Sequence, residues 1–290
     1  MSKIIVIVGP TGTGKTRLSI HLAKKLNAQI INADATQVYK DANIGTAKVS
    51  SEEMAHIVHH MINIAQLDEN YTVKDYQTDA RKILDKLISE DKNVIIVGGS
   101  GLYTKALLYD YNFTEEEDIK TYNNLTNEEL KEQVDLIYKD NDIHVNNRKR
   151  LERFLSHYEV TGEIIKNNEE KDKPLYNFTI IGLDADREVL YKRLDHRVEE
   201  MFINGLINEV KSLKNFNKTK SLIGYKETIM YLDGELSLDE AKELIKKNTR
   251  KYAKRQMTWY RHQFDNINWF QTDYDNFDNT INMVDKFLGL

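Results

Sequence analysis

The chain has 290 residues, enough for one large domain or two smaller ones with a substantial buried core. It contains no cysteine, which excludes disulfides and thiolate-held metals, and its net charge of −5 excludes a uniformly basic nucleic-acid-binding protein. No apolar run approaches the roughly 20 residues that span a bilayer, and the chain enters a predicted strand at once, so we expect a cytoplasmic protein with neither membrane segment nor signal peptide.

An apolar strand at 4–8 and a helix-like stretch at 17–26 enclose a glycine-rich segment. The segment matches the P-loop pattern G-x-x-x-x-G-K-[ST] in the strand–loop–helix setting that this pattern requires, with Gly9, Pro10, Thr11, Gly12, Thr13, Gly14, Lys15 and Thr16. Backbone amides at the helix start favour an oligophosphate, Lys15 adds a cation, and the Thr16 hydroxyl is a ligand for Mg²⁺. The segment therefore predicts nucleotide or diphosphate binding, as in ATP-binding proteins, without specifying the phosphate compound.

Apolar runs at 29–32, 94–97, 178–183 and 267–270 predict further strands, separated by helical stretches such as 76–89. This alternation predicts an α/β fold, a P-loop NTPase-like parallel sheet covered on both faces.

The segment 111–173 breaks the alternation. It opens on the acidic patch 115–118, carries a capping box at 126–129 and ends on the charged stretch 166–173. We predict that 1–110 and 174–290 form the P-loop core and that 111–173 is an inserted helical subdomain. A second capping box at 237–240 predicts a long C-terminal helix that ends near 262.

Three loops that follow predicted strands are expected to converge: the P-loop, 34–37 and 98–101. Ligands of open parallel sheets bind beyond the carboxyl ends of the strands. The strand at 94–97 ends in Gly-Gly-Ser rather than in the acidic residue that holds Mg²⁺ in many P-loop enzymes. We find Asp34 as the only carboxylate after a central strand. It is expected to be a displaced Mg²⁺ ligand, a base that faces the substrate, or a turn or helix cap, and Gly98-Gly99 is either part of the site or a plain tight turn.

The predicted C-terminal helix is strongly basic. Five cations share one face by helical spacing, with Gln256, Trp259 and His262 beside them: Lys247, Arg250, Lys251, Lys254 and Arg255. A smaller cluster, 148–153, lies in the inserted segment. Such surfaces suit phosphate contact with base stacking, as in RNA binding, although a charged helix face is also commonly just solvated.

These stretches resemble the bacterial tRNA dimethylallyltransferases, the tRNA isopentenyltransferase or IPP transferase family. Matching blocks follow in order over nearly the whole chain: 9–16, 32–39, 44–48, 59–64, 97–103, 223–227 and 253–261. The family has a P-loop-type α/β core with a helical insertion, which agrees with the elements predicted above.

The resemblance implies transfer of a dimethylallyl group from dimethylallyl diphosphate to the exocyclic N6 amine of the adenosine next to the anticodon in tRNA, with release of diphosphate. It implies Asp34 as general base, Ser100 in the place of a usual threonine, and Arg197 with Lys15 beside the leaving diphosphate. Mg²⁺ held partly by Thr16 is the implied cofactor.

The resemblance also marks positions that correspond to tRNA contacts. They are Asp34, Ala35, Thr36, Gln37, Ser100, Lys149, Arg150, Leu151, Glu152, Arg153, Ser221, Gly224, Tyr225, Lys226, Lys254, Arg255, Gln256, Trp259 and Arg261. The implied partners are dimethylallyl diphosphate and the tRNA anticodon stem-loop, and we expect a monomer. Tyr39 and Tyr103 either line the prenyl pocket or fill the core, and we expect the histidines at 56, 59 and 60 to pack or hydrogen-bond near the site rather than to bind a metal.

Three other functions stay open at this point. A prenyltransferase acting on free adenine nucleotide would have less need of the two basic surfaces. A small-molecule kinase would share the P-loop. A non-catalytic RNA-binding module would use the P-loop as a nucleotide sensor, and Asp34 and Ser100 argue against it.

Overall fold

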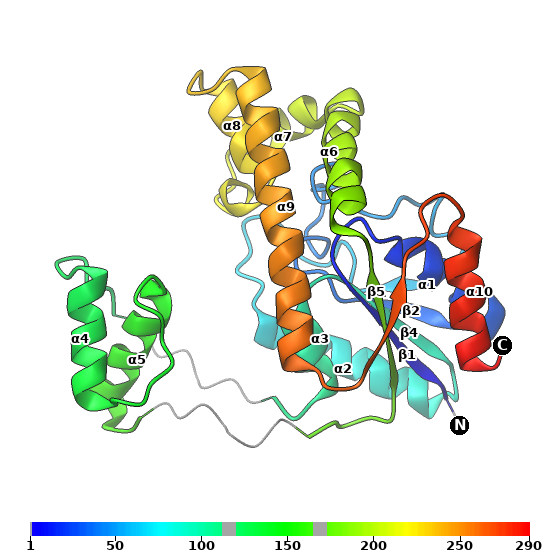
Figure 1. Ribbon diagram of the computed structural model, residues 1–290, viewed down its shortest axis with the longest axis horizontal. Helices are drawn as coiled ribbons and strands as arrows, with labels where there is room; N and C mark the ends of the chain where they lie inside the picture. Colours follow the sequence, from blue (N-terminus) through cyan, green and yellow to red (C-terminus); the bar gives the residue numbers. More distant parts are fainter. Residues whose placement is uncertain (1, 112–119, 165–172) are drawn as a thin grey trace. The chain divides into compact units, whose positions relative to one another are not determined.

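A computed structural model describes residues 2–111, 120–164 and 173–290 of the chain (Figure 1). The chain folds as two compact units, Met1–Tyr109 with Pro174–Leu290, and Asp110–Lys173. The expected limits of the insertion, 111 and 173, lie within one residue of this division. The acidic patch at 115–118 and nearly all of the charged stretch at 166–173 fall outside the described residues.

The first unit is built on a six-stranded sheet in the order β3-β2-β4-β1-β5-β6. The strands are β1 (Ile4–Val8), β2 (Gln29–Asn32), β3 (His59–His60), β4 (Val94–Val97), β5 (Thr179–Asp184) and β6 (Ile267–Gln271). Every paired strand is parallel, so the predicted parallel α/β sheet is confirmed. The short β3 was missed because its two histidines carry no apolar signal; His60 Nε2 lies 2.7 Å from Gln29 Oε1 on β2.

Alternate residues of β1 enter two different cores. Ile5 and Ile7 pack with α1 (Lys15–Leu26) and α10 (Phe277–Leu288), whereas Val6 and Val8 join the larger core on the other face. That core includes side chains of α2 (Val73–Ser89) and α3 (Gly101–Leu108). All of these strand side chains are nearly fully buried, and each such burial contributes about 1.5–3 kcal/mol. The buried strands thereby fix the position of the sheet's carboxyl end, where the loops after β1, β2 and β4 begin.

Five helical segments lie between β5 and β6 in the first unit. They are α6 (Arg187–Ile203), α7 (Leu206–Leu213), the 3₁₀ helix η1 (Thr219–Ser221), α8 (Tyr225–Leu232) and α9 (Leu238–Gln263). The capping box predicted for α9 is present: the Ser237 hydroxyl accepts from the Glu240 amide, and the Glu240 carboxylate accepts from the Ser237 amide. The predicted long C-terminal helix is therefore confirmed within one residue.

The second unit has its own small core. Its helices α4 (Asn127–Ile137) and α5 (Arg148–Thr161) pack through Leu130, Val134, Leu151, Phe154 and Leu155. The predicted capping box at 126–129 begins α4.

The chain leaves and rejoins the first unit at neighbouring residues. Tyr109 and Pro174 form one antiparallel bridge, and the Leu175 amide donates to the Leu108 carbonyl at 2.9 Å. Within the described ranges, no helix combines the length and the apolar character needed to cross a bilayer.

Candidate active site

The P-loop turns tightly between β1 and α1. Gly9, Gly12 and Gly14 all have positive φ. At Gly14, φ is 85°, and a Cβ would lie 2.3 Å from the Phe277 ring, so both backbone and packing require glycine. The Lys15 ammonium donates to the Pro10 carbonyl at 2.7 Å, and burial lowers the pKa of Lys15 to about 8. The loop thus places a cation and the amide end of α1 together, as phosphate binding needs.

Arg197 reaches this loop from α6. Its Nη1 donates to the Thr11 hydroxyl at 3.2 Å, and its Nη2 donates to the Ala47 carbonyl at 3.4 Å. Burial lowers the pKa of Arg197, and the charge of Asp34 opposes that shift. A guanidinium remains charged at any ordinary pH. The fold therefore brings two cations, Lys15 and Arg197, to one phosphate-binding loop, although Arg197 lies nearly 190 residues from that loop in the sequence.

Asp34 and Ser100 meet where β2 and β4 end. Asp34 Oδ1 accepts from the Thr36 amide at 2.9 Å and from the Thr36 hydroxyl at 2.7 Å. The Ser100 hydroxyl oxygen accepts from the Ala35 amide at 2.8 Å. In the described part of the chain, no donor reaches Asp34 Oδ2, which would lie 3.6 Å from a Cβ on Gly99. Asp34 is therefore a turn residue through one oxygen, and its other oxygen accepts no hydrogen bond from the described residues.

Helix α9 lies directly on the turn that carries Ser100. Gln256 Nε2 donates to the Gly99 carbonyl at 2.9 Å, and the Tyr260 hydroxyl donates to the Gly98 carbonyl at 3.3 Å. A Cβ on Gly101 would lie 1.9 Å from the Trp259 ring. The expectation that Gln256 stands beside the cations on an exposed surface is wrong, because the side chain is 5% exposed. The three predicted loops converge under this helix.

A second carboxylate follows a central strand, contrary to the sequence reading. Asp184 ends β5, and that reading stopped one residue earlier at the last apolar side chain. Asp184 Oδ2 accepts from Arg261 Nη2 at 2.7 Å, and Oδ1 accepts from the Ala185 amide at 2.7 Å. Both oxygens are engaged inside the protein, which leaves Asp34 as the better candidate for a base. Arg261, a predicted tRNA contact, is paired and still half-exposed.

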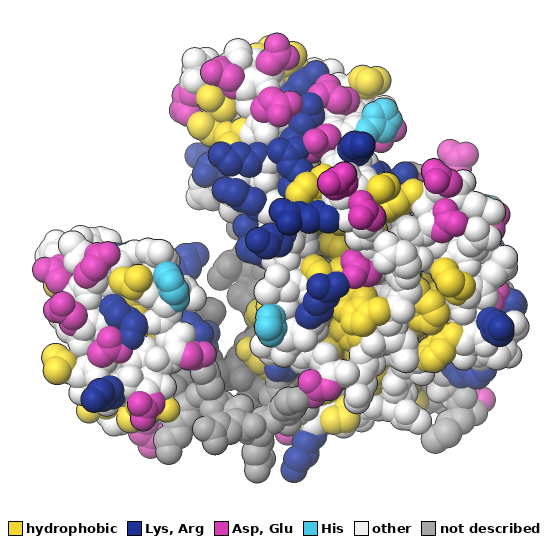
Figure 2. Space-filling model, in the orientation of Figure 1, with side chains coloured by type: hydrophobic (Ala, Val, Ile, Leu, Met, Phe, Trp, Pro, Cys, Tyr) yellow, Lys and Arg dark blue, Asp and Glu magenta, His cyan; other side chains and the backbone are white. Residues whose placement is uncertain are grey.

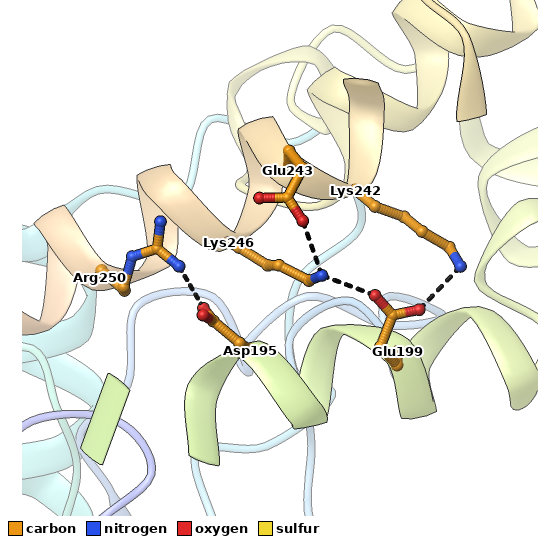
Figure 3. A network of polar contacts seen from close by, with 6 residues as sticks. All are labelled: Asp195, Glu199, Lys242, Glu243, Lys246 and Arg250. Atoms are coloured by element: carbon orange, nitrogen blue, oxygen red, sulfur yellow. Dashed lines mark hydrogen bonds and ion pairs between the residues drawn. The ribbon is translucent and has the colours of Figure 1, made fainter. Parts of the chain in front are cut away.

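The basic helix face is partly neutralised. Figure 2 shows Lys and Arg side chains gathering over α8 and the middle of α9. Arg250 pairs with Asp195 of α6, and Glu199 of α6 receives Lys242 and Lys246, each at 2.7 Å (Figure 3). Such half-exposed pairs stabilise by about 1 kcal/mol or less each, so their main effect is to orient the two helices. Besides Arg261, the cations of α9 that remain exposed are Lys247, Lys251, Lys254 and Arg255.

The other predicted tRNA positions divide into exposed and buried ones. Leu151 is fully buried in the second unit, Glu152 pairs with Arg148 at 2.9 Å, and Tyr225 is fully buried, so these three side chains do not lie on the surface. Gly224 is also buried, and Arg150 pairs with Asp142. Those that lie exposed are Lys149, Arg153, Ser221 and Lys226, while Ala35, Thr36 and Gln37 are half-buried beside Asp34.

Two residues that the sequence analysis missed support the site. Glu209 of α7 accepts from the backbone amides of Asn43, Ile44 and Gly45 and from the Tyr225 hydroxyl. Nothing in the sequence marks it, because the three amides that it accepts from lie over 160 residues away.

Tyr252 lies one turn before Gln256 on α9, and helical spacing from Gln256 could have found it. Burial and the Asp34 charge raise the pKa of Tyr252 to about 12, while hydrogen bonds with Ser100 and Gln256 act the other way.

A cavity of about 630 Å³ borders Arg197, and no P-loop residue lines it. Its lining combines apolar, cationic and anionic side chains, among them Ile44, Lys48, Met54, Arg197 and Glu200. The candidate prenyl-pocket tyrosines are core residues instead: Tyr39 is 1% exposed, and Tyr103 stacks on Tyr76 with ring centroids 4.0 Å apart.

The donor set for Mg²⁺ fits the P-loop mode of binding. Thr16 is exposed in the first turn of α1, next to the amide end that would hold a phosphate. Mg²⁺ usually takes one or two protein oxygens and completes its shell with waters and substrate phosphates. A single hydroxyl beside a diphosphate therefore suffices.

Comparisons with known proteins agree with this geometry. The family model for IPP transferase matches residues 37–263. A tRNA dimethylallyltransferase of Oceanobacillus iheyensis is 41% identical over 298 residues, which cover 97% of this chain and 95% of that protein.

Two solved structures share the fold along the whole chain. The full-length tRNA isopentenylpyrophosphate transferase of Bacillus halodurans has a TM-score of 0.76 and 35% identity, with 100% of this chain and 96% of that chain covered. A eukaryotic dimethylallyltransferase solved acting on tRNA has a TM-score of 0.80 and 28% identity, with 100% and 80% covered.

Proposed function

This chain belongs to the IPP transferase family, and on that basis we propose that it is a tRNA dimethylallyltransferase. It transfers a dimethylallyl group from dimethylallyl diphosphate to the exocyclic N6 amine of the adenosine next to the anticodon and releases diphosphate. The observation that carries the proposal is the meeting of a carboxylate with an open oxygen, Asp34, and a P-loop with two cations, Lys15 and Arg197.

Asp34 acts as the general base. An exocyclic adenine amine is a weak nucleophile, because its lone pair is delocalised into the ring. A carboxylate that accepts its proton while the N–C bond forms accelerates transfer by about 10²–10⁴-fold. The bond between Thr36 and Oδ1 holds the carboxylate, so Oδ2 faces the amine. Ser100 fixes the Ala35 amide and so holds the loop that carries the base.

The P-loop stabilises the leaving group. As the C–O bond breaks, the electron pair stays with the diphosphate, whose added charge meets the loop amides, Lys15 and Arg197. When bound, Mg²⁺ held by Thr16 supplies further positive charge to the same oxygens. The allylic carbon shares its positive charge with the double bond, which suits displacement from carbon. The apolar lining of the cavity beside Arg197 suits the dimethylallyl chain.

The exposed cations of α9 and α5 hold the anticodon stem-loop. Lys254 and Arg255 on α9, and Lys149 and Arg153 on α5, are exposed and suit contacts with RNA phosphates. The target base must leave its stack to reach a carbon above the P-loop, at a cost of a few kcal/mol. These contacts compensate for that cost. A tRNA-modifying enzyme of this kind works where tRNA is charged and used, in the cytoplasm, and we expect it to act as a monomer.

The test is incubation of the purified protein with labelled dimethylallyl diphosphate and, in parallel, unmodified tRNA, free AMP, or ATP with a small acceptor. We expect label in tRNA, at N6 of the base next to the anticodon, and equimolar diphosphate. Label in AMP alone would assign the enzyme to free nucleotides, and ADP formation would identify a kinase; either result overturns the proposal.

A further inference from the structure

The P-loop and the turn that carries Ser100 separate after their strands end. β1 and β4 are paired as far as Ile7 and Val97, and the Gly98 amide then donates to the Ile7 carbonyl at 3.3 Å. In the described part of the chain, this is the last main-chain hydrogen bond between the two segments. Beyond it, something else must set the distance between the phosphate loop and the base-binding turn.

One buried side chain spans this gap. Gln256 Oε1 accepts from the Thr11 amide at 2.9 Å, and Gln256 Nε2 donates to the Gly99 carbonyl at 2.9 Å. An amide carries an acceptor and a donor side by side without charge at any ordinary pH, so it satisfies both main-chain groups at once. Gly99 leaves room for it, because a Cβ there would lie 2.2 Å from Nε2. The contact therefore requires an amide side chain at position 256 and a residue without a Cβ at position 99.

The same bridge is connected to both parts of the candidate site, the phosphate-binding loop with Arg197 and the turn beside Asp34. Thr11 also receives Arg197 on its hydroxyl, so Gln256 and Arg197 hold one P-loop residue from two helices. On the other side, a Cβ on Gly99 would lie 2.2 Å from Gln256 Nε2 and 3.6 Å from Asp34 Oδ2, so the bridge ends close to Asp34. A shift of the turn relative to the loop would change the distance between the base and the diphosphate-bearing carbon.

We propose that Gln256 is a positioning residue that sets the register between the P-loop and the Ser100 turn, and thereby aligns the diphosphate ester with the acceptor amine. The proposal rests on the proposed function and concerns the same site. It replaces a direct contact of Gln256 with tRNA, which the burial of the side chain does not support.

Two substitutions separate positioning from packing. Gln256→Leu keeps the volume and removes both hydrogen bonds. Gln256→Glu keeps the shape, and only its protonated carboxyl group reproduces the acceptor for Thr11 and the donor for Gly99. Burial raises the pKa of an introduced carboxyl group, so its protonated fraction grows as the pH falls. The matched control is Gln263→Leu, an exposed glutamine of the same helix whose side chain accepts from Lys105 at 3.1 Å.

We would measure kcat and KM for both substrates, tRNA affinity and melting temperature for each variant. A misalignment of the reacting groups lowers kcat by about 10²-fold, so we expect that loss in Gln256→Leu with tRNA affinity unchanged. We expect the activity of Gln256→Glu, divided by that of wild type at the same pH, to rise as the pH falls. Gln263→Leu should match wild type.

Two results would overturn the inference. One is a Gln256→Leu variant whose kcat equals that of wild type. The other is an equal loss in both variants at every pH, in step with melting temperature, which would reduce Gln256 to a packing residue. Failure of the proposed function is distinct, because wild type itself would then transfer no dimethylallyl group to tRNA.

Discussion

The hydroxyl oxygen of Ser100 accepts a hydrogen bond of 2.8 Å from the amide of Ala35. This single bond ties the loop after β4 to the loop after β2, next to Asp34. The Ser100 amide in turn donates to the Ala33 carbonyl at 3.1 Å. The carboxylate proposed as base is therefore held by its neighbours on both sides rather than by its own side chain alone.

Ser100→Ala, which removes that hydroxyl, should lower activity. Ser100→Thr, which keeps the hydroxyl and adds a methyl group, should not. Ser100→Ala leaves the half-buried Ala35 amide without its acceptor, at a cost of about 1–3 kcal/mol, and loosens the Asp34 loop. We expect kcat to fall by about tenfold for Ser100→Ala and to stay near wild type for Ser100→Thr. Steady-state kinetics with saturating tRNA measure this, and equal kcat values for the two variants would contradict it.

The base assignment depends on Asp34. Asp34→Asn keeps the size and the hydrogen bond to the Thr36 amide but cannot accept the proton of the amine. We expect kcat to fall by about 10²-fold or more, with tRNA affinity unchanged, in single-turnover assays. Asp184→Asn is the matched control, since Asp184 also lies at the end of a strand but its carboxylate accepts a hydrogen bond from Arg261. A loss below tenfold for Asp34→Asn would remove Asp34 from the role of base.

Diphosphate affinity should weaken at alkaline pH. The pKa of Lys15 in the folded protein is about 8, below its ordinary value of 10.5, so the ammonium is lost as the pH rises through 8. Above that pH, binding requires proton uptake, and the Kd for dimethylallyl diphosphate rises by up to about tenfold per pH unit. Calorimetry in buffers of different ionisation heat measures both effects. Lys15→Arg stays charged, so its Kd should not follow this trend; a parallel rise there would assign the effect to another group.

The exposed cations of α9 should contribute to tRNA affinity through phosphates. Substitution of both Lys254 and Arg255 by alanine should raise the Kd for tRNA and lower the slope of log K against log salt by about two, one for each lost contact. The control is the pair Lys74→Ala and Lys82→Ala, which removes two exposed cations from α2. Equal slopes for the test pair and wild type would show that this helix face is merely solvated.

Glu209 should stabilise the fold. Its carboxylate receives three backbone amides and the Tyr225 hydroxyl, and hydrogen bonds to a charged group contribute about 1.5–3 kcal/mol. We expect Glu209→Gln to lower the free energy of unfolding by about 2 kcal/mol in urea titrations. Tyr225→Phe should lower it by less, because the three amides keep their acceptor. A larger loss in Tyr225→Phe would place the stabilisation in the hydroxyl instead.

Local patterns predicted the parts of this fold whose burial is nearly complete. The apolar run at 4–8 packs on both faces of the sheet, and the glycines that follow it leave few alternatives to a P-loop. The strand β3 escaped prediction because its two residues pair with β2 and bring no side-chain pattern of their own.

Side-chain partners far apart in sequence were beyond prediction. Helical spacing correctly grouped the cations of α9, yet it could not show that Asp195 neutralises Arg250 from 55 residues away. The same spacing set Gln256 beside the cations, although its amide lies beneath the helix on two loops. Spacing along a helix defines faces, and only the tertiary fold decides which face is covered.

The bridge between Tyr109 and Pro174 has an evolutionary consequence. Residues 110–173 leave and rejoin the first unit at this one place, so no strand pairing of the parallel sheet depends on what lies between them. A short hairpin could close the core in their place, and a longer or unrelated appendage could be exchanged there without rethreading a single strand. The inserted segment and the sheet that carries the P-loop are thus free to diversify separately.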